Sequence, residues 1–232
     1  MVYDSPHPSE MDLSRFEEIE RLLDAVYGPR ILRANGDPVS ELVGTILSQN
    51  TSDVNTARSF ASLRDGFPTW EDVIAADTAD VAESIRMGGL SNIKAPRIQA
   101  ALQSILDRRG SLDLAFLQEM PLVEAQAWLT AQDGIGPKTA ACVLLFSLGM
   151  PAMPVDTHVG RVMTRLGVVP DKTSTITKER LLETLIGDDA DRMYAVHVET
   201  IAHGRKVCKA QRPLCEQCHL QSLCRYYREH TQ

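Results

Sequence analysis

Apolar residues recur at three- and four-residue steps along most of the chain, and this spacing predicts amphipathic helices. One such stripe comprises Phe16, Ile19, Leu22, Leu23 and Val26, and a second comprises Ile98, Ala101, Leu102, Ile105 and Leu106. Side chains at these steps share one helix face and can pack together against a core. Further helices are expected over 39–47, 53–63, 122–131, 139–148, 158–166, 178–186 and 190–202. Strand-like alternation is nearly absent, so we predict an all-α protein.

The length and composition fit a globular protein with a core of its own. A chain of 232 residues can form one large domain or two small ones. Its apolar runs fall short of the roughly 20 residues that a membrane span needs, and its start has neither a basic nor an apolar leader region. We therefore expect no membrane segment and a cytoplasmic protein. Cys142 lies in an apolar helical run and is expected to be a reduced thiol that packs in the core.

Charge is distributed unevenly along the chain. The formal net charge of −7 argues against a simple polyanion binder, because such proteins usually carry an excess of lysine and arginine. Residues 1–25 are strongly acidic, whereas six basic residues face only two acidic ones over 201–232. This distribution is compatible with a basic face on an acidic protein, and also with an ordinary solvated run of charges.

Four cysteines close to the C-terminus follow the spacing C-x6-C-x2-C-x5-C. They are Cys208, Cys215, Cys218 and Cys224. Four thiolates this close in sequence can converge on one centre, and both zinc and a [4Fe-4S] cluster accept four sulfur ligands. Buried or disulfide-bonded cysteines are the alternative, but the intervening segment is short and polar. The pattern therefore indicates a metal or iron-sulfur site without distinguishing the two.

A glycine-rich turn separates two of the expected helices. In the segment 133–141, Gly134 and Gly136 permit a tight turn, and Pro137 suits the first turn of the next helix. Backbone amides at such a turn can bind a DNA phosphate, although glycine turns between packed helices are also common. Lys138 follows at the helix start, where the macrodipole favours a neutral, nucleophilic amine. Taken alone, a lysine next to such a hairpin is more often a phosphate contact than a nucleophile.

Several motifs, in order along nearly the whole chain, resemble the helix-hairpin-helix DNA glycosylases of the endonuclease III type. The hairpin Gly-Ile-Gly-Pro-Lys-Thr-Ala is followed by Val155-Asp156-Thr157-His158 and then by the four cysteines. Upstream, the segment 47–53 and the pair Gly89-Leu90 resemble two DNA-contacting loops of that family. The resemblance implies a six-helix barrel domain over 30–150, with the hairpin motif at about 122–148. It also implies an iron-sulfur cluster domain formed by 1–29 and 151–232, with its cluster loop at 208–224.

The resemblance further assigns roles to individual residues. Lys138 would be the catalytic nucleophile and Asp156 the catalytic carboxylate, although Asp156 could also simply cap the helix that follows. Gln49 would fill the gap left by an extruded base, and Leu90 would intercalate; an ordinary surface glutamine and a core leucine are the alternatives. The remaining roles are phosphate contacts at Lys209 and Arg212, beside Gly134 and Gly136, and a [4Fe-4S] cluster rather than zinc on the four cysteines.

The function that the resemblance implies is base excision repair. The expected enzyme is a bifunctional DNA glycosylase and apurinic/apyrimidinic (AP) lyase that acts on oxidised pyrimidines in damaged double-stranded DNA. We expect a monomer with no obligate protein partner, associated with the nucleoid in the cytoplasm. A mismatch-directed thymine or adenine glycosylase and a noncatalytic DNA-binding iron-sulfur protein are the alternatives. Two departures affect the substrate range: Asp133 adds a negative charge beside the hairpin, and Ser91 places no aromatic ring after Leu90.

Overall fold

The computed structural model describes residues 13–230, which contain helices, turns and loops but no strand. The expected all-α class is thus confirmed. The chain divides into two compact units: Ala34–Met150, and a unit built from both chain ends, Met1–Arg33 with Pro151–Gln232. None of the described helices combines the length and the apolar character that crossing a membrane requires. The acidic residues before 13 lie outside the described part.

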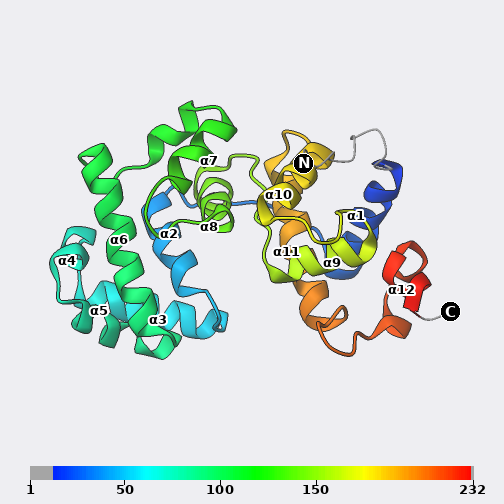
Figure 1. Cartoon of the computed structure of the whole chain (residues 1–232), viewed down its shortest axis with the longest axis horizontal. Helices are drawn as coiled ribbons and strands as arrows, with labels where there is room; N and C mark the ends of the chain where they lie inside the picture. The colour runs from blue at the N-terminus through cyan, green and yellow to red at the C-terminus, as the bar shows by residue number, and fades with distance from the viewer. Residues whose placement is uncertain (1–12, 231–232) are drawn as a thin grey trace. The chain divides into compact units, whose positions relative to one another are not determined.

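The unit Ala34–Met150 contains the predicted hairpin (Figure 1). Its helices are α2 (Pro38–Leu47), α3 (Asp53–Gly66), α4 (Trp70–Ala75), α5 (Thr78–Ser84), α6 (Ser91–Arg109), α7 (Leu122–Thr130) and α8 (Pro137–Cys142). Helix α2 packs against α3, α6 and α8, while α4 and α5 pack on α6. Buried aliphatic side chains of α2 and α6, such as Leu42, Ile46, Ile98 and Leu102, form its core.

Local sequence explains where helices of this unit begin. Asp37 caps α2 by accepting a hydrogen bond from the Ser40 amide at 3.0 Å, and Pro38 occupies the first turn. Helix α6 starts differently, because it follows Gly89 and Leu90, which both have positive φ angles, 68° and 53°. A leucine rarely adopts this conformation, so the start of α6 is a point of local backbone strain.

The second unit packs five helices, including the two nearest the chain ends. They are α1 (Leu13–Tyr27), α9 (Thr157–Leu166), α10 (Thr175–Ile186), α11 (Ala190–Lys206) and α12 (Arg225–His230). Helix α11 contacts α1, α9 and α10, and α12 packs on α9. Gly167 ends α9 in a left-handed conformation, and the next amide returns to the Met163 carbonyl at 2.9 Å.

The structure departs from the periodicity in a few places. The short helices α4, α5 and α12 were not expected, because six or seven residues are too few to show a periodic stripe. The helix expected over 139–148 begins at Pro137 and continues after Cys142 as a π-helical turn, Val143–Ser147. Val26, which was expected on a core-facing stripe, is 41% exposed near the end of α1. The prediction that Cys142 is a buried free thiol is confirmed.

Candidate functional site

Helices α7 and α8 form a hairpin whose loop closes on the side of α6. Gly134 adopts φ +76°, and an added Cβ there would lie 3.0 Å from the Arg97 Cγ and 3.2 Å from the Arg97 carbonyl oxygen. Gly136 caps α8 with φ −93°, and an added Cβ at Gly136 would meet nothing within 4 Å. Only the first glycine is therefore required by the packing. The second leaves open space beside the start of α8.

Gln132 and Asp133, which precede this loop, have different surroundings. Gln132 is buried; its Nε2 donates to the Trp128 carbonyl at 2.6 Å and its Oε1 accepts from the Ser104 hydroxyl at 3.0 Å. The bond with Ser104 connects the hairpin loop to α6, and the bond with Trp128 connects it to α7. Asp133 is exposed, and its amide donates to the same serine hydroxyl at 3.3 Å. The negative charge of Asp133 thus lies at the surface next to the hairpin glycines.

Lys138 is half-buried in the first turn of α8, and α2 packs against this helix. Its charge acts on Glu41 of α2, a carboxyl that the sequence did not single out. Burial raises the pKa of Glu41, whereas hydrogen bonds from Asn35 and Thr45 and the charge of Lys138 lower it. Asn35 Nδ2 donates to Glu41 at 3.0 Å and Thr45 Oγ1 donates at 3.3 Å. A fixed carboxyl thus accompanies the lysine in the same unit.

Arg97 of α6 connects the hairpin to the loop after α2. Its Nε donates to the Gly134 carbonyl at 2.8 Å, and its Nη1 donates to Gln49 Oε1 at 3.0 Å. One guanidinium therefore brings together Gly134 and Gln49, which are far apart in sequence. Nothing in the local sequence around Arg97 marks it for this role, because the contact exists only in the folded unit.

The loop after α2 presents two neighbouring amide side chains in different ways. Gln49 is half-buried and bound by Arg97, whereas Asn50 is exposed with φ 55°. Asparagine tolerates this left-handed conformation better than most residues, so its position in a turn was a signal available in the sequence. Leu90 is 48% exposed at the start of α6, which excludes the alternative of a core leucine. We call residues 48–50 the amide turn and residues 89–90 the leucine loop.

Asp156 belongs to the other unit, where it is the N-cap of α9. Its carboxylate accepts a hydrogen bond from the Val159 amide at 2.7 Å. The preceding segment 153–155 is held by three side chains. Glu183 accepts from the Met153 amide at 3.0 Å, His197 Nδ1 lies 2.8 Å from the Pro154 carbonyl, and Glu179 accepts from the Val155 amide. The helix cap and these contacts fix the backbone on both sides of Asp156.

The four cysteines line one cavity together with apolar residues of α9 and the ring of Tyr226. In residues 13–230, no three histidine, cysteine or acidic side chains converge closely enough to hold a single metal ion. Both a [4Fe-4S] cluster and zinc accept four thiolate ligands. Lys209 and Arg212 are exposed on the same loop, and Arg212 has φ 50°.

Two side chains lie within hydrogen-bonding distance of cysteine sulfurs in this cavity. Arg165 Nη1 lies 3.3 Å from Cys208 Sγ and also donates to the Lys209 carbonyl at 2.7 Å. His203 Nε2 lies 3.5 Å from Cys218 Sγ, while the Tyr27 hydroxyl lies 3.1 Å from His203 Nδ1. In the tautomer in which the tyrosine hydroxyl donates to Nδ1, the proton of the neutral imidazole is on Nε2 and faces the sulfur.

Burial shifts the pKa values of these groups. It lowers the pKa of His203 to about 4, with a smaller contribution from His219, so the ring is neutral near pH 7. Burial also raises the pKa of Cys218 to about 11 and that of Cys215 above its usual value, and the neighbouring cysteines add to both shifts. Metal binding at this cavity must therefore displace protons from thiols.

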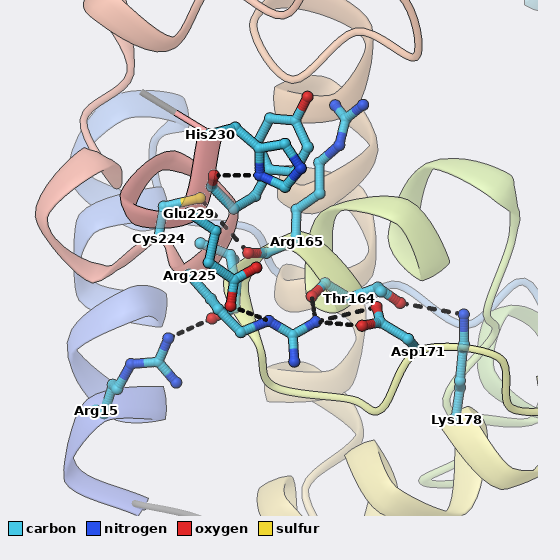
Figure 2. Close-up of polar contacts among 11 residues, drawn as sticks. Arg15, Thr164, Arg165, Asp171, Lys178, Cys224, Arg225, Glu229 and His230 are labelled. Atoms are coloured by element: carbon cyan, nitrogen blue, oxygen red, sulfur yellow. Dashed lines mark hydrogen bonds and ion pairs between the residues drawn. The ribbon is translucent and has the colours of Figure 1, made fainter. Parts of the chain in front are cut away.

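The cysteine loop is attached to α9 at both ends, and Figure 2 shows the contacts at the Cys224 end. Arg225, directly after Cys224, donates to the Thr164 carbonyl at 3.2 Å and forms an ion pair of 2.9 Å with Asp171. Arg15 of α1 donates to the Leu223 carbonyl at 2.6 Å and also to the carbonyl of Leu166. Arg161 of α9 donates to the carbonyls of Cys208 and Gly204, both at 3.0 Å, which makes it a structural anchor of the loop.

The sequence and fold of this chain can be compared with those of known proteins. The family model of the HhH-GPD superfamily of base excision DNA repair proteins matches residues 43–186, more than half of the chain and parts of both units. The chain belongs to the HhH-GPD superfamily. This membership confirms the family and the fold that the sequence motifs predicted.

Relatives of this HhH-GPD protein include enzymes of similar length. Endonuclease III of Thermotoga maritima is 33% identical over 192 residues, which cover 83% of this chain and 84% of that protein. A putative DNA glycosylase of Arabidopsis thaliana is 43% identical over 129 residues, but the match spans only 44% of that longer protein. A solved structure of a trapped covalent endonuclease III–DNA intermediate superposes with a TM-score of 0.78 and 27% identity, covering 95% of this chain and 99% of that one.

Proposed function

We propose that this HhH-GPD protein is a bifunctional DNA glycosylase and AP lyase that removes oxidised pyrimidines from double-stranded DNA. The observation that carries the proposal is the position of Lys138, half-buried in the first turn of the second hairpin helix. The likeness to endonuclease III over most of the chain supports it, as does the covalent DNA intermediate trapped with one such enzyme. The proposal requires no second protein chain and places the enzyme with chromosomal DNA.

The reaction begins with the neutral amine of Lys138. Its Nζ attacks C1′ of the damaged nucleotide, the bond from C1′ to the base breaks, and the base leaves with the bonding electrons and takes up a proton. Opening of the sugar ring then gives an imine between Nζ and C1′. Loss of a proton from C2′ allows the 3′ phosphate to leave by β-elimination, which cleaves the strand.

Two carboxyl groups have chemistry that suits these steps. Asp156 caps α9, and a carboxylate facing the sugar stabilises the positive charge that develops at C1′ or accepts a proton from the amine. Glu41 lies in the same unit as Lys138, and the charge of the lysine lowers the pKa of this carboxyl. Glu41 therefore contributes to the electrostatic environment of the amine. Capping and catalysis by Asp156 are compatible, because the cap uses one carboxylate oxygen, Oδ1.

Damaged DNA is held by backbone groups and by two loops. The hairpin glycines Gly134 and Gly136 present amides to a phosphate, and Lys209 with Arg212 supplies positive charge from the cysteine loop. The target base must leave the helix before its sugar can be attacked. We assign the leucine loop as the wedge that enters the duplex, and the amide turn, through Gln49 or its exposed neighbour Asn50, as the group that fills the vacated space.

Cys208, Cys215, Cys218 and Cys224 are the proposed ligands of a [4Fe-4S] cluster. Their shared cavity and the donors on Cys208 and Cys218 fit a cluster with four thiolates. The bound cluster supplies a rigid centre that orders the loop. The residues of the chain do the rest: Arg165 and Arg225 tie the loop to α9, and the exposed cations of the loop bind phosphates.

Borohydride trapping tests the proposal directly. Purified enzyme with its measured iron content is incubated with duplexes carrying one thymine glycol or one abasic site, and sodium borohydride reduces any imine to a stable adduct. We expect a covalent adduct with the parent protein and none with Lys138→Gln, which keeps the hydrogen-bonding capacity but removes the nucleophile. Lys209→Gln is the matched control, because it removes a cation from the surface and should retain the adduct.

Two results would contradict different parts of the proposal. A folded, iron-loaded parent that gives no adduct on either duplex would exclude the lysine mechanism, while base release without an adduct would indicate a monofunctional glycosylase. An adduct on the abasic duplex with no release of thymine glycol would retain the lyase and refute the assigned lesion. An adduct that persists in Lys138→Gln would show that another amine is the nucleophile.

A further inference from the structure

Lys94 is a buried lysine on the first turn of α6. It is 2% exposed and lies beside the fully buried Ala95, one helical turn before Ile98. Burial lowers the pKa of its ammonium, because a charge is poorly solvated in an apolar surrounding. A buried lysine therefore needs strong compensating contacts, and the identity of those contacts indicates what the side chain is for.

The hydrogen bonds of Lys94 run to two backbone carbonyls from distant segments. Its Nζ donates to the Leu47 carbonyl at 2.8 Å and to the Gly88 carbonyl at 3.0 Å. Leu47 is the last residue of α2 and directly precedes the amide turn. Gly88 directly precedes the leucine loop. One ammonium thus joins the residues that directly precede the two loops. These are the loops that we propose act when the target nucleotide leaves the DNA helix.

The surroundings of Gly88 make its peptide a firm support for the leucine loop. An added Cβ at Gly88 would lie 2.7 Å from the Ser59 hydroxyl and 3.9 Å from Lys94 Nζ. The Ser59 hydroxyl in turn donates to the Ile85 carbonyl at 3.3 Å in a buried position. After this packed segment, Gly89 and Leu90 adopt positive φ angles, and about half of the Leu90 side chain is exposed to solvent. The Ser59 hydroxyl therefore bonds the chain three residues before Gly88, whereas the carbonyl directly before the leucine loop is bonded by Lys94.

Arg97, one turn further along α6, also contacts the amide turn, through a side chain. It binds the Gln49 side chain and the Gly134 carbonyl, whereas Lys94 binds the main chain. Lys94 thus bonds the main chain directly before the amide turn, and Arg97 bonds a side chain within it. The hydrogen bonds of Lys94 join the residues that directly precede the amide turn and the leucine loop.

We propose that Lys94 is a positioning residue that sets the separation of the amide turn and the leucine loop, so that wedge and gap-filling side chain enter the duplex together. This inference rests on the proposed function and deepens it. Lys94 does not touch the reacting atoms. It acts through the Leu47 and Gly88 carbonyls on the residues that follow them.

The test separates positioning from folding and from chemistry. One duplex carries an uncleavable abasic analogue opposite 2-aminopurine, whose fluorescence rises when it is unstacked, and a second carries thymine glycol for single-turnover base release at saturating enzyme. Lys94→Met keeps the length of the side chain but removes both hydrogen bonds. Ser59→Ala is the matched control, because it removes a buried hydrogen bond under the same loop and leaves Lys94 in place. Lys94→Gln, whose amide is too short to bridge both carbonyls, serves if the methionine variant does not fold.

We expect Lys94→Met to lower both the fluorescence rise and the saturated rate of base release at least tenfold, with affinity for undamaged DNA unchanged within about twofold. Ser59→Ala should retain both signals at a similar loss of unfolding stability. The double variant with Lys94→Met and Leu90→Ala should lose little more fluorescence rise and base-release rate than the more strongly affected single variant. The reason is that the position of the leucine loop no longer matters when the leucine side chain is removed.

Two outcomes would overturn the role of Lys94. In the first, Lys94→Met loses no more signal than Ser59→Ala. In the second, the losses of Lys94→Met and Leu90→Ala multiply in the double variant, which shows independent action. The two substrates keep this proposal separate from the proposed function: a parent that unstacks 2-aminopurine without releasing thymine glycol refutes the lesion, and the fluorescence arm still decides the role of Lys94.

Discussion

Glu179 of α10 should make the protein less stable as the pH rises, and Glu179→Gln should remove that dependence. The side chain is 4% exposed, and no described group forms a hydrogen bond with its Oε1 atom. Burial raises the pKa of this carboxyl from 4.5 to about 8; the Val155 amide opposes the shift and Glu183 adds to it. Glutamine has nearly the same shape and can still accept the hydrogen bond from Val155, so the substitution mainly removes the ionisation.

The sign follows from proton binding. Because the folded pKa lies above the unfolded value, the folded state holds this proton more tightly. The stabilisation is complete below about pH 4.5 and is lost as the pH rises through about 8. One pKa unit corresponds to about 1.4 kcal/mol, so the free energy of unfolding should fall by about 3 kcal/mol between pH 5 and pH 8 through this group alone.

Urea unfolding followed by circular dichroism, at a series of pH values between these limits, measures the effect. The quantity of interest is the difference between Glu179→Gln and the parent, because Glu199, whose pKa burial raises to about 7, titrates in both proteins. Between pH 5 and pH 8, the free energy of unfolding of Glu179→Gln should rise relative to that of the parent by about 3 kcal/mol. Glu119→Gln, at an exposed carboxyl, should show no such shift. Parallel curves for the parent and Glu179→Gln would refute the electrostatic reasoning.

Three further substitutions test the hairpin and the carboxylate. Asp156→Asn should retain the cap of α9, with a stability change below about 0.5 kcal/mol, yet slow single-turnover base release about 100-fold; a fully active variant would remove the catalytic role. Asp133→Ala should tighten binding to undamaged DNA about two- to fivefold in low salt, measured by fluorescence anisotropy, and unchanged affinity would exclude repulsion by this exposed charge. Gly134→Ala should destabilise the protein by about 2 kcal/mol in urea titrations because of its φ of +76° and the close Arg97 backbone. The control Gly136→Ala should lose clearly less, and equal losses would contradict the packing explanation.

The helical class and most longer helices were predictable because burial selects residues on one face of each helix. Four of the five members of the second apolar stripe are fully buried, namely Ile98, Ala101, Leu102 and Ile105, and Leu106 is partly exposed. Val26 was misassigned because a one-dimensional stripe does not show where the neighbouring helix ends. The hairpin and the cysteine loop were visible for another reason: glycine, proline and cysteine have chemical constraints that do not depend on distant residues.

Contacts between distant segments could not be predicted in this way. Lys94 and Arg97 look like ordinary solvated cations of a helix, and their carbonyl and amide partners lie in other elements. The sulfur contact of Arg165 is equally invisible, since the residue and Cys208 are joined only by folding. Asn50 lies between: its residue type favours the observed left-handed turn, but its exposure beside the bound Gln49 required the structure.

Helix α9 has two differently engaged ends, and this has a consequence for how active enzyme accumulates. Asp156 caps its first turn, and Thr164 to Leu166 at its last turn receive the arginines that fasten the cysteine loop. The ten-residue helix is only about 15 Å long. We propose that the cluster orders the cysteine loop. In a chain without iron, Asp156, the proposed catalytic carboxylate, would then cap a helix whose last turn lacks its firm attachment to that loop. Iron delivery would then act as the final maturation step, and the repair capacity of a cell would follow its metal supply as well as its rate of protein synthesis.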